Sequence, residues 1–240
     1  VGSEMCIRDR TNDEEIKPCR TYFWKKIKDK VQGKAMVEAA LEINHWCAGE
    51  VMYQGTDMRT GSALEIYRSG VGRCGEEAVF VVNVMRSAGI PARPVYVPRW
   101  SHCDDNHAWV EVWCDGDWHY LGACEPEAVL DKGWFTAAAS RAMIIHSRMF
   151  SDYVENEEIV THEGLTTVCN ELSRYADTQT FSVTVTENGQ PLSGVTLRIE
   201  LLNYSEFFPI STLVTDENGK ASITLGLGDL HIHALKDGRF

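Results

Sequence analysis

The chain has 240 residues, of which 44% are apolar and 24% charged, a composition typical of folded globular proteins. Its 35 acidic residues outnumber its 23 lysines and arginines, giving a net charge of -12, and no long basic run occurs. These features argue against nucleic acids and anionic membrane surfaces as partners. No apolar run reaches the roughly 18 to 20 residues that span a bilayer, so we expect no membrane span.

The first ten residues, VGSEMCIRDR, do not look like the start of a domain. They resemble translated sequencing-adapter sequence and carry no signal-peptide pattern. We therefore expect residues 1–10 to be a non-native leader. The eight cysteines form no C-x-x-C pair and no compact framework, so they do not indicate a redox compartment.

Two long helical segments are expected in the first part of the chain. Residues 14–50 have apolar side chains at three- and four-residue spacing, which predicts two helical pieces that meet near Gly33. The following MYQGTDMRTGSALEIYRSG is expected to be irregular. In residues 72–89, Gly72 and Gly75 lie around Cys74 at the start and Gly89 lies at the end, where helix start and stop signals belong. Because this segment is apolar nearly all round, we expect a central, buried helix.

Strands are expected further along the chain. IPARPVYVP and HAWVEVW have strand character, and Asp115-Gly116 predicts a hairpin between VEVWC and DWHYL. Residues 130–179 are expected to be mixed and mainly helical. From Phe181 onward apolar and polar residues alternate, with turns at Asn188-Gly189 and Asn218-Gly219. We expect a β-sandwich over residues 179–240, cut short at its end.

Cys74 is the first candidate for chemistry. An average cysteine is a small buried apolar residue. The glycines around Cys74, however, allow close backbone approach to a substrate, and the start of a buried helix favours a thiolate through its unpaired N–H groups. Glu76 and Glu77 would oppose this effect in part. A thiolate nucleophile also needs a base, and a group that orients the base.

His107 is the candidate base. It begins HAWVEVW, where the two-residue period of a strand places it on one face with Trp109, Glu111 and Trp113. A lone histidine at a strand start is usually a surface residue, but the large aromatic residues that follow could shield this one from bulk water. The tryptophans are most simply core residues and cross-strand pairs, with one or two walling a cleft; they are Trp100, Trp109, Trp113, Trp118 and Trp134.

GRCGEEAVFVVNVMRSAGIPARPVYVPRW followed by DNHAWVEVWCDGDWHYLGACEPE is similar to the transglutaminase-like superfamily, over roughly residues 46–150. The resemblance implies a papain-like α+β fold with a Cys, His and usually Asp triad, in a superfamily of amide cross-linkers, proteases and amidases. It assigns Cys74 as the nucleophile and His107 as the base. We expect the transglutaminase-like domain, with its N-terminal helical portion, to cover residues 11–178.

The acid of the triad is where this sequence departs from the resemblance. The superfamily's acid commonly lies four residues beyond the tryptophan after the hairpin turn, and that position is Gly122. The nearest acid is Glu125. A two-residue hairpin loop would place His107 opposite Cys124 and turn Glu125 away, whereas a three-residue loop, or a bulge around Gly122, would bring Glu125 to His107. We expect Glu125 to orient the imidazole.

Other candidates for the site are weaker. Asp104 and Asp105 precede His107 too closely to lie comfortably beside its ring, and are better interpreted as a loop rim. Papain-like sites also use an upstream side chain as oxyanion donor, for which Gln54 is the first candidate and Trp46 the second. A solvated loop residue is an equally good interpretation of Gln54.

Histidines and cysteines between residues 102 and 124 also suggest zinc, because both are zinc ligands. The hairpin, however, sends Cys114 and His119 to the end far from His107, and no C-x-x-C or H-x-x-x-H clip is present. We therefore expect no metal and no cofactor.

The expected function is thiol-dependent acyl transfer on an amide or peptide bond. Hydrolysis by a peptidase or amidase is favoured over cross-linking, because no calcium loop is evident. The expected partner is a protein or peptide substrate, cell-wall peptides included. The alternative is a catalytically inactive, transglutaminase-like binding module of the cell envelope, which Gly122 supports. Residues 179–240 resemble carboxypeptidase regulatory-like and immunoglobulin-like modules, which implies a secreted, periplasmic or envelope location.

Overall fold

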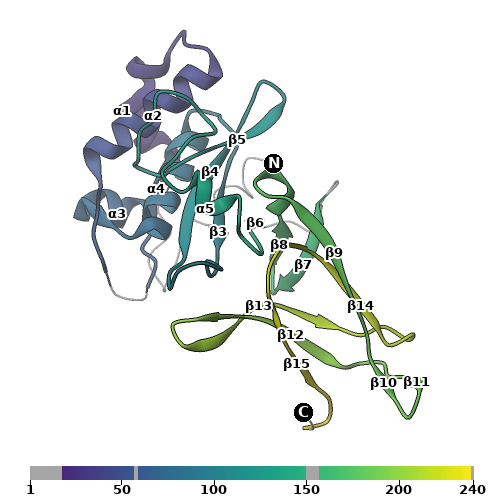
Figure 1. Ribbon diagram of the computed structural model, residues 1–240. Helices are drawn as coiled ribbons and strands as arrows, with labels where there is room; N and C mark the ends of the chain where they lie inside the picture. Colours follow the sequence, from purple (N-terminus) through teal and green to yellow (C-terminus); the bar gives the residue numbers. More distant parts are fainter. Residues whose placement is uncertain (1–17, 57–58, 150–156, 239–240) are drawn as a thin grey trace. The chain divides into compact units, whose positions relative to one another are not determined.

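The computed structural model describes residues 18–56, 59–149 and 157–238, and the chain divides into two compact units (Figure 1). The first unit comprises Val1–Tyr96, His107–Thr136 and Arg148–Ser151, and the second comprises Val97–Asn106, Ala137–Ser147 and Asp152–Phe240. The expected leader, residues 1–10, lies outside the described residues. The boundary expected between residues 178 and 179 stays a prediction.

The helices of the first unit are α1 (Arg20–Val31), α2 (Met36–Glu50), α3 (Ala63–Ser69) and α4 (Cys74–Ser87). Gly33 lies between α1 and α2 with φ of 81°, a conformation that glycine adopts without strain, so the predicted break is confirmed. The other three helices pack against α4, and most of its residues are buried, as predicted. No helix in the described ranges is long and apolar enough to cross a membrane.

Helix α3 lies in the segment that was expected to be irregular, so that expectation was wrong. The side chain of Ser62 caps its start by accepting a hydrogen bond from the backbone of Glu65 at 3.4 Å, and Gly70 ends it with φ of 69°. Strands β1 (Met52–Tyr53) and β2 (Val71–Gly72) flank α3 and pair in parallel. This pairing brings the loop after β1 beside the residues that precede Cys74.

Strands β3 (Ala92–Val97), β4 (His107–Cys114) and β5 (Asp117–Leu121) lie in the order β5-β4-β3. The predicted hairpin is confirmed: Cys114 pairs with Asp117, and the two residues between them, Asp115 and Gly116, both have positive φ. Alternate residues of β4 pack into the same apolar core as the helices; they are Ala108, Val110, Val112 and Cys114. The other face of β4 carries His107 and Trp109.

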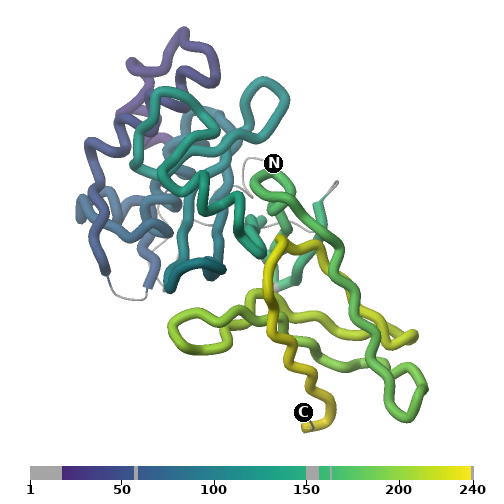
Figure 2. The backbone as a smooth tube through the Cα atoms, viewed as in Figure 1, coloured from purple at the N-terminus to yellow at the C-terminus, as the bar shows by residue number. Residues whose placement is uncertain are grey.

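The second unit consists largely of strands, whose path can be followed in Figure 2. Strand β7 (Glu158–Glu163) pairs with β8 (Thr166–Asn170), next to which lies β6 (His146–Met149). The expectation that residues 130–179 are mainly helical was therefore wrong. In the described part of that range only α5 (Thr136–Ala139) and the turn Leu172–Arg174 are helical. The β-branched residues of IVTHEGLTTV, with a turn at the central glycine, favour the hairpin.

The later strands form antiparallel sheets: β10 (Thr186–Glu187) with β11 (Gln190–Pro191), β14 (Lys220–Gly226) with β9 (Thr178–Thr184), and β12 (Thr196–Asn203) between β13 (Glu206–Val214) and β15 (His231–Leu235). The Asn188-Gly189 turn is confirmed between β10 and β11, with φ of 51° and 79°. Ile199 of β12, Ile210 of β13 and Leu225 of β14 share one apolar cluster. The expected β-rich module is present, and its assignment as a sandwich stays a prediction.

Candidate active site

Cys74 is the first residue of helix α4 and is half-buried. The backbone N–H groups of a first helical turn have no partner within the helix, and they carry the positive end of the helix dipole. Both effects favour a thiolate over a thiol at this position. Glu76 reaches back to the start of the helix, where its Oε2 accepts a hydrogen bond from the backbone N–H of Arg73 at 2.9 Å.

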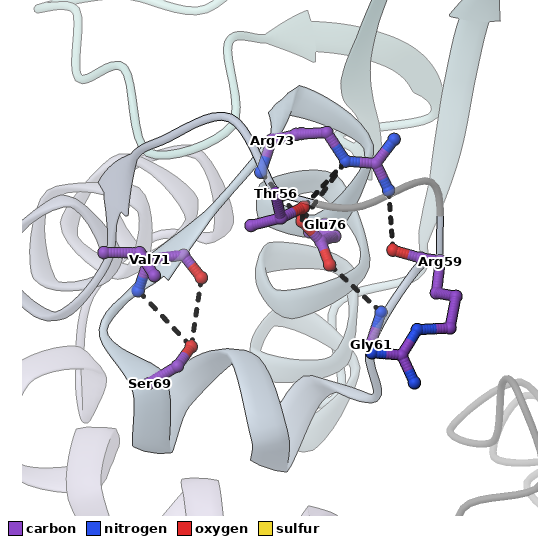
Figure 3. A network of polar contacts seen from close by, with 7 residues as sticks. All are labelled: Thr56, Arg59, Gly61, Ser69, Val71, Arg73 and Glu76. Carbon is purple, nitrogen blue, oxygen red and sulfur yellow. Dashed lines mark hydrogen bonds and ion pairs between the residues drawn. The ribbon is translucent and has the colours of Figure 1, made fainter.

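Arg73 and Glu76 also hold the loop that follows Gln54 (Figure 3). Glu76 accepts hydrogen bonds from the Thr56 hydroxyl at 2.6 Å and from the backbone N–H of Gly61 at 3.2 Å. The Arg73 guanidinium donates to the Thr56 hydroxyl at 2.9 Å and to the backbone oxygen of Arg59 at 2.7 Å. This network ties the loop to the start of the helix that begins with Cys74.

The network also sets the charge of Glu76. Burial by itself would raise the pKa of this carboxyl, but the hydrogen bonds from Thr56, Arg73 and Gly61, together with the positive charge of Arg73, hold it below its usual value. Glu76 is therefore ionised at neutral pH. Its negative charge is offset by the guanidinium of Arg73, 3.5 Å away, which limits its effect on Cys74.

Gln54 lies close in the fold to the nucleophile, because its backbone N–H donates to the oxygen of Gly72 at 2.9 Å. Its side chain is exposed, so its role as an oxyanion donor stays a prediction. Trp46, the second candidate, stacks on Tyr67 with ring centroids 6.0 Å apart and lies equally far from the ring of Phe80. Trp46 thus belongs to the aromatic core between the helices.

His107 begins β4 and is only 5% exposed. Three aromatic rings enclose its imidazole, with centroids 4.7 Å away for Trp134, 4.9 Å for Phe135 and 5.8 Å for Trp109. The surroundings agree with the expectation that aromatic residues shield this ring from bulk water.

Asp104 and Asp105 serve the backbone of a loop. Asp104 accepts a hydrogen bond from the backbone N–H of Tyr204 at 2.7 Å, and Asp105 accepts one from that of Asn106 at 2.8 Å. These bonds agree with the interpretation of the two aspartates as a loop rim.

Glu125 lies in a turn that follows β5. The hairpin pairing ends at Val110 and Leu121, after which an isolated antiparallel bridge joins Gly122 to Glu125. Of the two arrangements that could bring Glu125 toward His107, the three-residue hairpin loop is absent and a local irregularity at Gly122 is present. A Cβ atom built on Gly122 would overlap Oε2 of Glu125. The Glu125 carboxylate thus occupies the space where a side chain at position 122 would begin.

Trp134 connects this carboxylate to the imidazole. Its indole N–H donates to Oε1 of Glu125 at 2.9 Å, while its ring lies against that of His107. Trp134 is 65% exposed, so of the roles expected for the tryptophans a wall of the site fits it and a core position does not. Burial raises the pKa of Glu125, although the bond from Trp134 opposes this effect.

Glu77 is a buried acid near Cys74 that no sequence pattern indicated as a site residue. It lies one helical turn after Cys74 and is 3% exposed. Burial, then the charge of Glu125, then that of Glu76 raise the pKa of Glu77 to about 8. The influence of Glu125 means that the turn after β5 lies near the first turn of α4. The contacts in this part of the site run from Glu125 through Trp134 to His107.

The buried Glu77 carboxyl predicts a pH-dependent stability. In the unfolded chain Glu77 titrates near its usual value of 4.5, and in the folded chain near 8. Between these values the folded state keeps a proton that the unfolded state releases, so this contribution to stability is complete below about pH 4.5 and is lost as the pH rises to about 8. Glu77→Gln is expected to flatten the decline, by at most about 1.4 kcal/mol per pH unit.

Urea unfolding at intervals from pH 5 to pH 8 measures this effect. Glu38→Gln, which neutralises an exposed carboxylate on α2, is the matched control and should leave the decline unchanged. Parallel curves for the parent and Glu77→Gln would contradict the assignment.

Among the described residues, no group of three or more histidine, cysteine, aspartate or glutamate side chains could hold a metal ion.

Comparison with known proteins gives a family match for part of the chain. Residues 25–123 match the model of the transglutaminase-like superfamily. This segment includes Cys74, His107 and Gln54 and ends two residues before Glu125. No curated protein matches the chain.

Several solved structures are similar in part. One, described as a candidate cysteine protease from Cytophaga hutchinsonii, is 18% identical with a TM-score of 0.38, covering 64% of this chain and 57% of its own. A candidate protease from Parabacteroides distasonis is 12% identical with a TM-score of 0.40, covering 88% and 49%. The transglutaminase of red sea bream is 12% identical with a TM-score of 0.37, covering 83% and 48%. This chain thus spans about half the length of these proteins.

Proposed function

From the premise that the chain carries a transglutaminase-like core over residues 25–123, we propose that it catalyses thiol-dependent acyl transfer on amide or peptide bonds, with Cys74 as nucleophile and His107 as base. The observation that carries this proposal is the surroundings of His107. A buried imidazole on a strand that packs against the helix of Cys74 is enclosed by aromatic rings, one of which binds the carboxylate of Glu125.

The proposed reaction has two steps. The Cys74 thiolate attacks the carbonyl carbon of the substrate and forms a carbon–sulfur bond, and the protonated His107 gives its proton to the departing amine. His107 then takes a proton from water as the water attacks the thioester; the carbon–sulfur bond breaks, the acid is released, and the Cys74 thiolate and protonated His107 are restored. An amine in place of water would give a cross-link. We favour water as the acceptor of the acyl group, which makes the protein a peptidase or amidase. Its proposed substrate is a protein or peptide. Its proposed location is extracytoplasmic.

The other residues have supporting roles in this proposal. Glu125 orients the imidazole and stabilises its protonated form, replacing the acid that Gly122 cannot supply. Gln54 and the backbone N–H of Cys74 would donate hydrogen bonds to the oxyanion of the tetrahedral intermediate. The competing function is a binding module without catalysis. Its support is Gly122, but the carboxylate of Glu125 over that glycine favours a working site.

The pH dependence of Cys74 alkylation tests the proposal. With iodoacetamide and peptide mass mapping, we expect rapid labelling of Cys74 well below the ordinary thiol range of about 8.5, because an imidazolium stabilises the thiolate. His107→Ala should move this labelling into the ordinary range. Cys103 provides an internal control in every sample, because its side chain is exposed to the reagent. The pKa of its thiol is raised by partial burial and by the charges of Asp105 and Asp104, so it should be labelled only at high pH.

If Cys74 is labelled only in the ordinary thiol range, whether or not His107 is present, the thiolate–imidazolium pair does not exist. The binding function would then be the better account of the chain.

A further inference from the structure

Asn44 is a buried polar residue whose side chain bonds to the turn at residues 122–125, here termed the acid turn. It lies on α2, 78 residues before Gly122, and is 1% exposed. Its Nδ2 donates to the backbone oxygen of Gly122 at 2.9 Å and, at 3.4 Å, to that of Glu125. Its Oδ1 accepts from the backbone N–H of Cys124 at 3.0 Å. The side-chain amide of Asn44 thus binds the backbone of three of the four residues of the acid turn.

The acid turn needs such support, because the sheet no longer provides it. The β4–β5 pairing stops at Leu121, so the backbone groups that follow have no strand partner in that hairpin. Cys124 also adopts a positive φ of 56°, which is uncommon for a residue other than glycine. An amide offers a donor and an acceptor side by side, and so replaces the hydrogen bonds of a strand for this short segment.

The acid turn decides where the Glu125 carboxylate lies. The side chain of Glu125 folds back over Gly122 and meets the indole of Trp134, and the backbones of Gly122 and Glu125 form a bridge beneath it. Without Asn44 the N–H of Cys124 and the backbone oxygen of Gly122 would each lose a hydrogen bond, while that oxygen would keep the bond from the N–H of Glu125 at 3.2 Å. The acid turn would move to recover the lost bonds. Displacements of about 1 Å at a group of this kind can lower a rate by about a hundredfold.

We propose that Asn44 is a positioning residue, which holds the acid turn so that Glu125 supports the His107 imidazole. This inference rests on the proposed function and extends it to a helix that carries none of the reacting groups. A purely structural role for Asn44 would affect stability alone, whereas a positioning role also affects the pH dependence of Cys74.

Asn83 is the matched control. It is also a buried amide on a helix of the first unit, but it contacts other groups: its Nδ2 donates to the backbone oxygen of Val79 at 2.9 Å, and its Oδ1 accepts from the Cys19 thiol at 3.6 Å. Asn83→Ala removes a buried amide without touching the acid turn. It therefore shows what lost stability alone does to the labelling of Cys74.

The experiment measures iodoacetamide labelling of Cys74 against pH in the full chain, with urea unfolding of each variant. Asn44→Ala is expected to move the labelling midpoint upward by about one pH unit, toward the value for His107→Ala, which is about a tenfold fall in rate on the acid side. Asn83→Ala should lower stability and leave the midpoint at the parental value. An unchanged midpoint in Asn44→Ala would overturn the inference.

A double variant tests whether Asn44 acts through Glu125. Asn44→Ala combined with Glu125→Ala is expected to have the midpoint of Glu125→Ala alone, because residues that act through one group are not additive. Additive shifts would contradict the inference. If Asn44→Ala does not fold, Asn44→Ser takes its place in both measurements. Failure of the proposed function looks different, because the parent itself would then label only in the ordinary thiol range.

Discussion

Cys74→Ala is expected to abolish cleavage of fluorescein-labelled casein by the full chain, with a loss of at least about 10³-fold. The thiolate forms the covalent bond to the substrate. The other described cysteine at a helix start, Cys19 before α1, is buried and 3% exposed. Neighbouring residues cannot replace it, because Glu77 is buried and Glu76 is bound to Arg73, Thr56 and Gly61. The measurement is the rate of fluorescence release at equal protein concentration.

Cys103→Ala is the matched control for this loss, since it removes an exposed thiol outside the site and should keep the parental rate. A second reaction mixture contains dansylcadaverine and dimethylcasein. Release of peptides that depends on Cys74 supports hydrolysis as the reaction. Incorporation of the amine without release of peptides would show that the reaction is cross-linking and not hydrolysis. Casein cleavage that is equal in Cys74→Ala and the parent would eliminate Cys74 as the nucleophile.

Much of the first unit could be predicted from the sequence, because its signals are local. The apolar spacing of residues 14–50 and the glycines at both ends of the α4 segment define helices without tertiary information. The Asp115-Gly116 pair likewise predicts the hairpin, whose two-residue loop, one of two lengths left open by the sequence, has the positive φ values of a tight hairpin. These elements carry Cys74 and His107, so both candidates could be found from the chain alone.

The remainder of the site depends on contacts between distant segments. Hairpin pairing gives the position of each residue only as far as Leu121, so the turn that folds Glu125 over Gly122 could be named as one alternative but not chosen. Asn44 had no distinguishing signal, because a buried asparagine within a helix resembles any other helical polar residue. For the same reason the sequence could not say which tryptophans wall the site: only its neighbours show that Trp134 joins Glu125 to His107.

Arg93→Ala is expected to lower the free energy of unfolding by about 3 to 5 kcal/mol, because it removes the cation that pairs with the buried Glu111 carboxylate. Arg93 of β3 and Glu111 of β4 form an ion pair at 2.6 Å and are 3% and 1% exposed. The guanidinium also lies over the ring of Trp118, 4.2 Å from its centroid. Urea unfolding at pH 7 measures the loss.

The double variant Arg93→Met with Glu111→Leu separates the attraction between the two charges from the cost of burying them. It removes both charges and keeps apolar volume, so it should be more stable than Arg93→Ala despite losing the ion pair. Lys34→Ala, which breaks a half-exposed pair with Glu42 at 2.8 Å, should cost at most about 1 kcal/mol. Equal losses for Arg93→Ala and Lys34→Ala would mean that water reaches the buried pair. Since His107 begins the strand that carries Glu111, such water would also weaken the shielding of the imidazole on which the proposed chemistry depends.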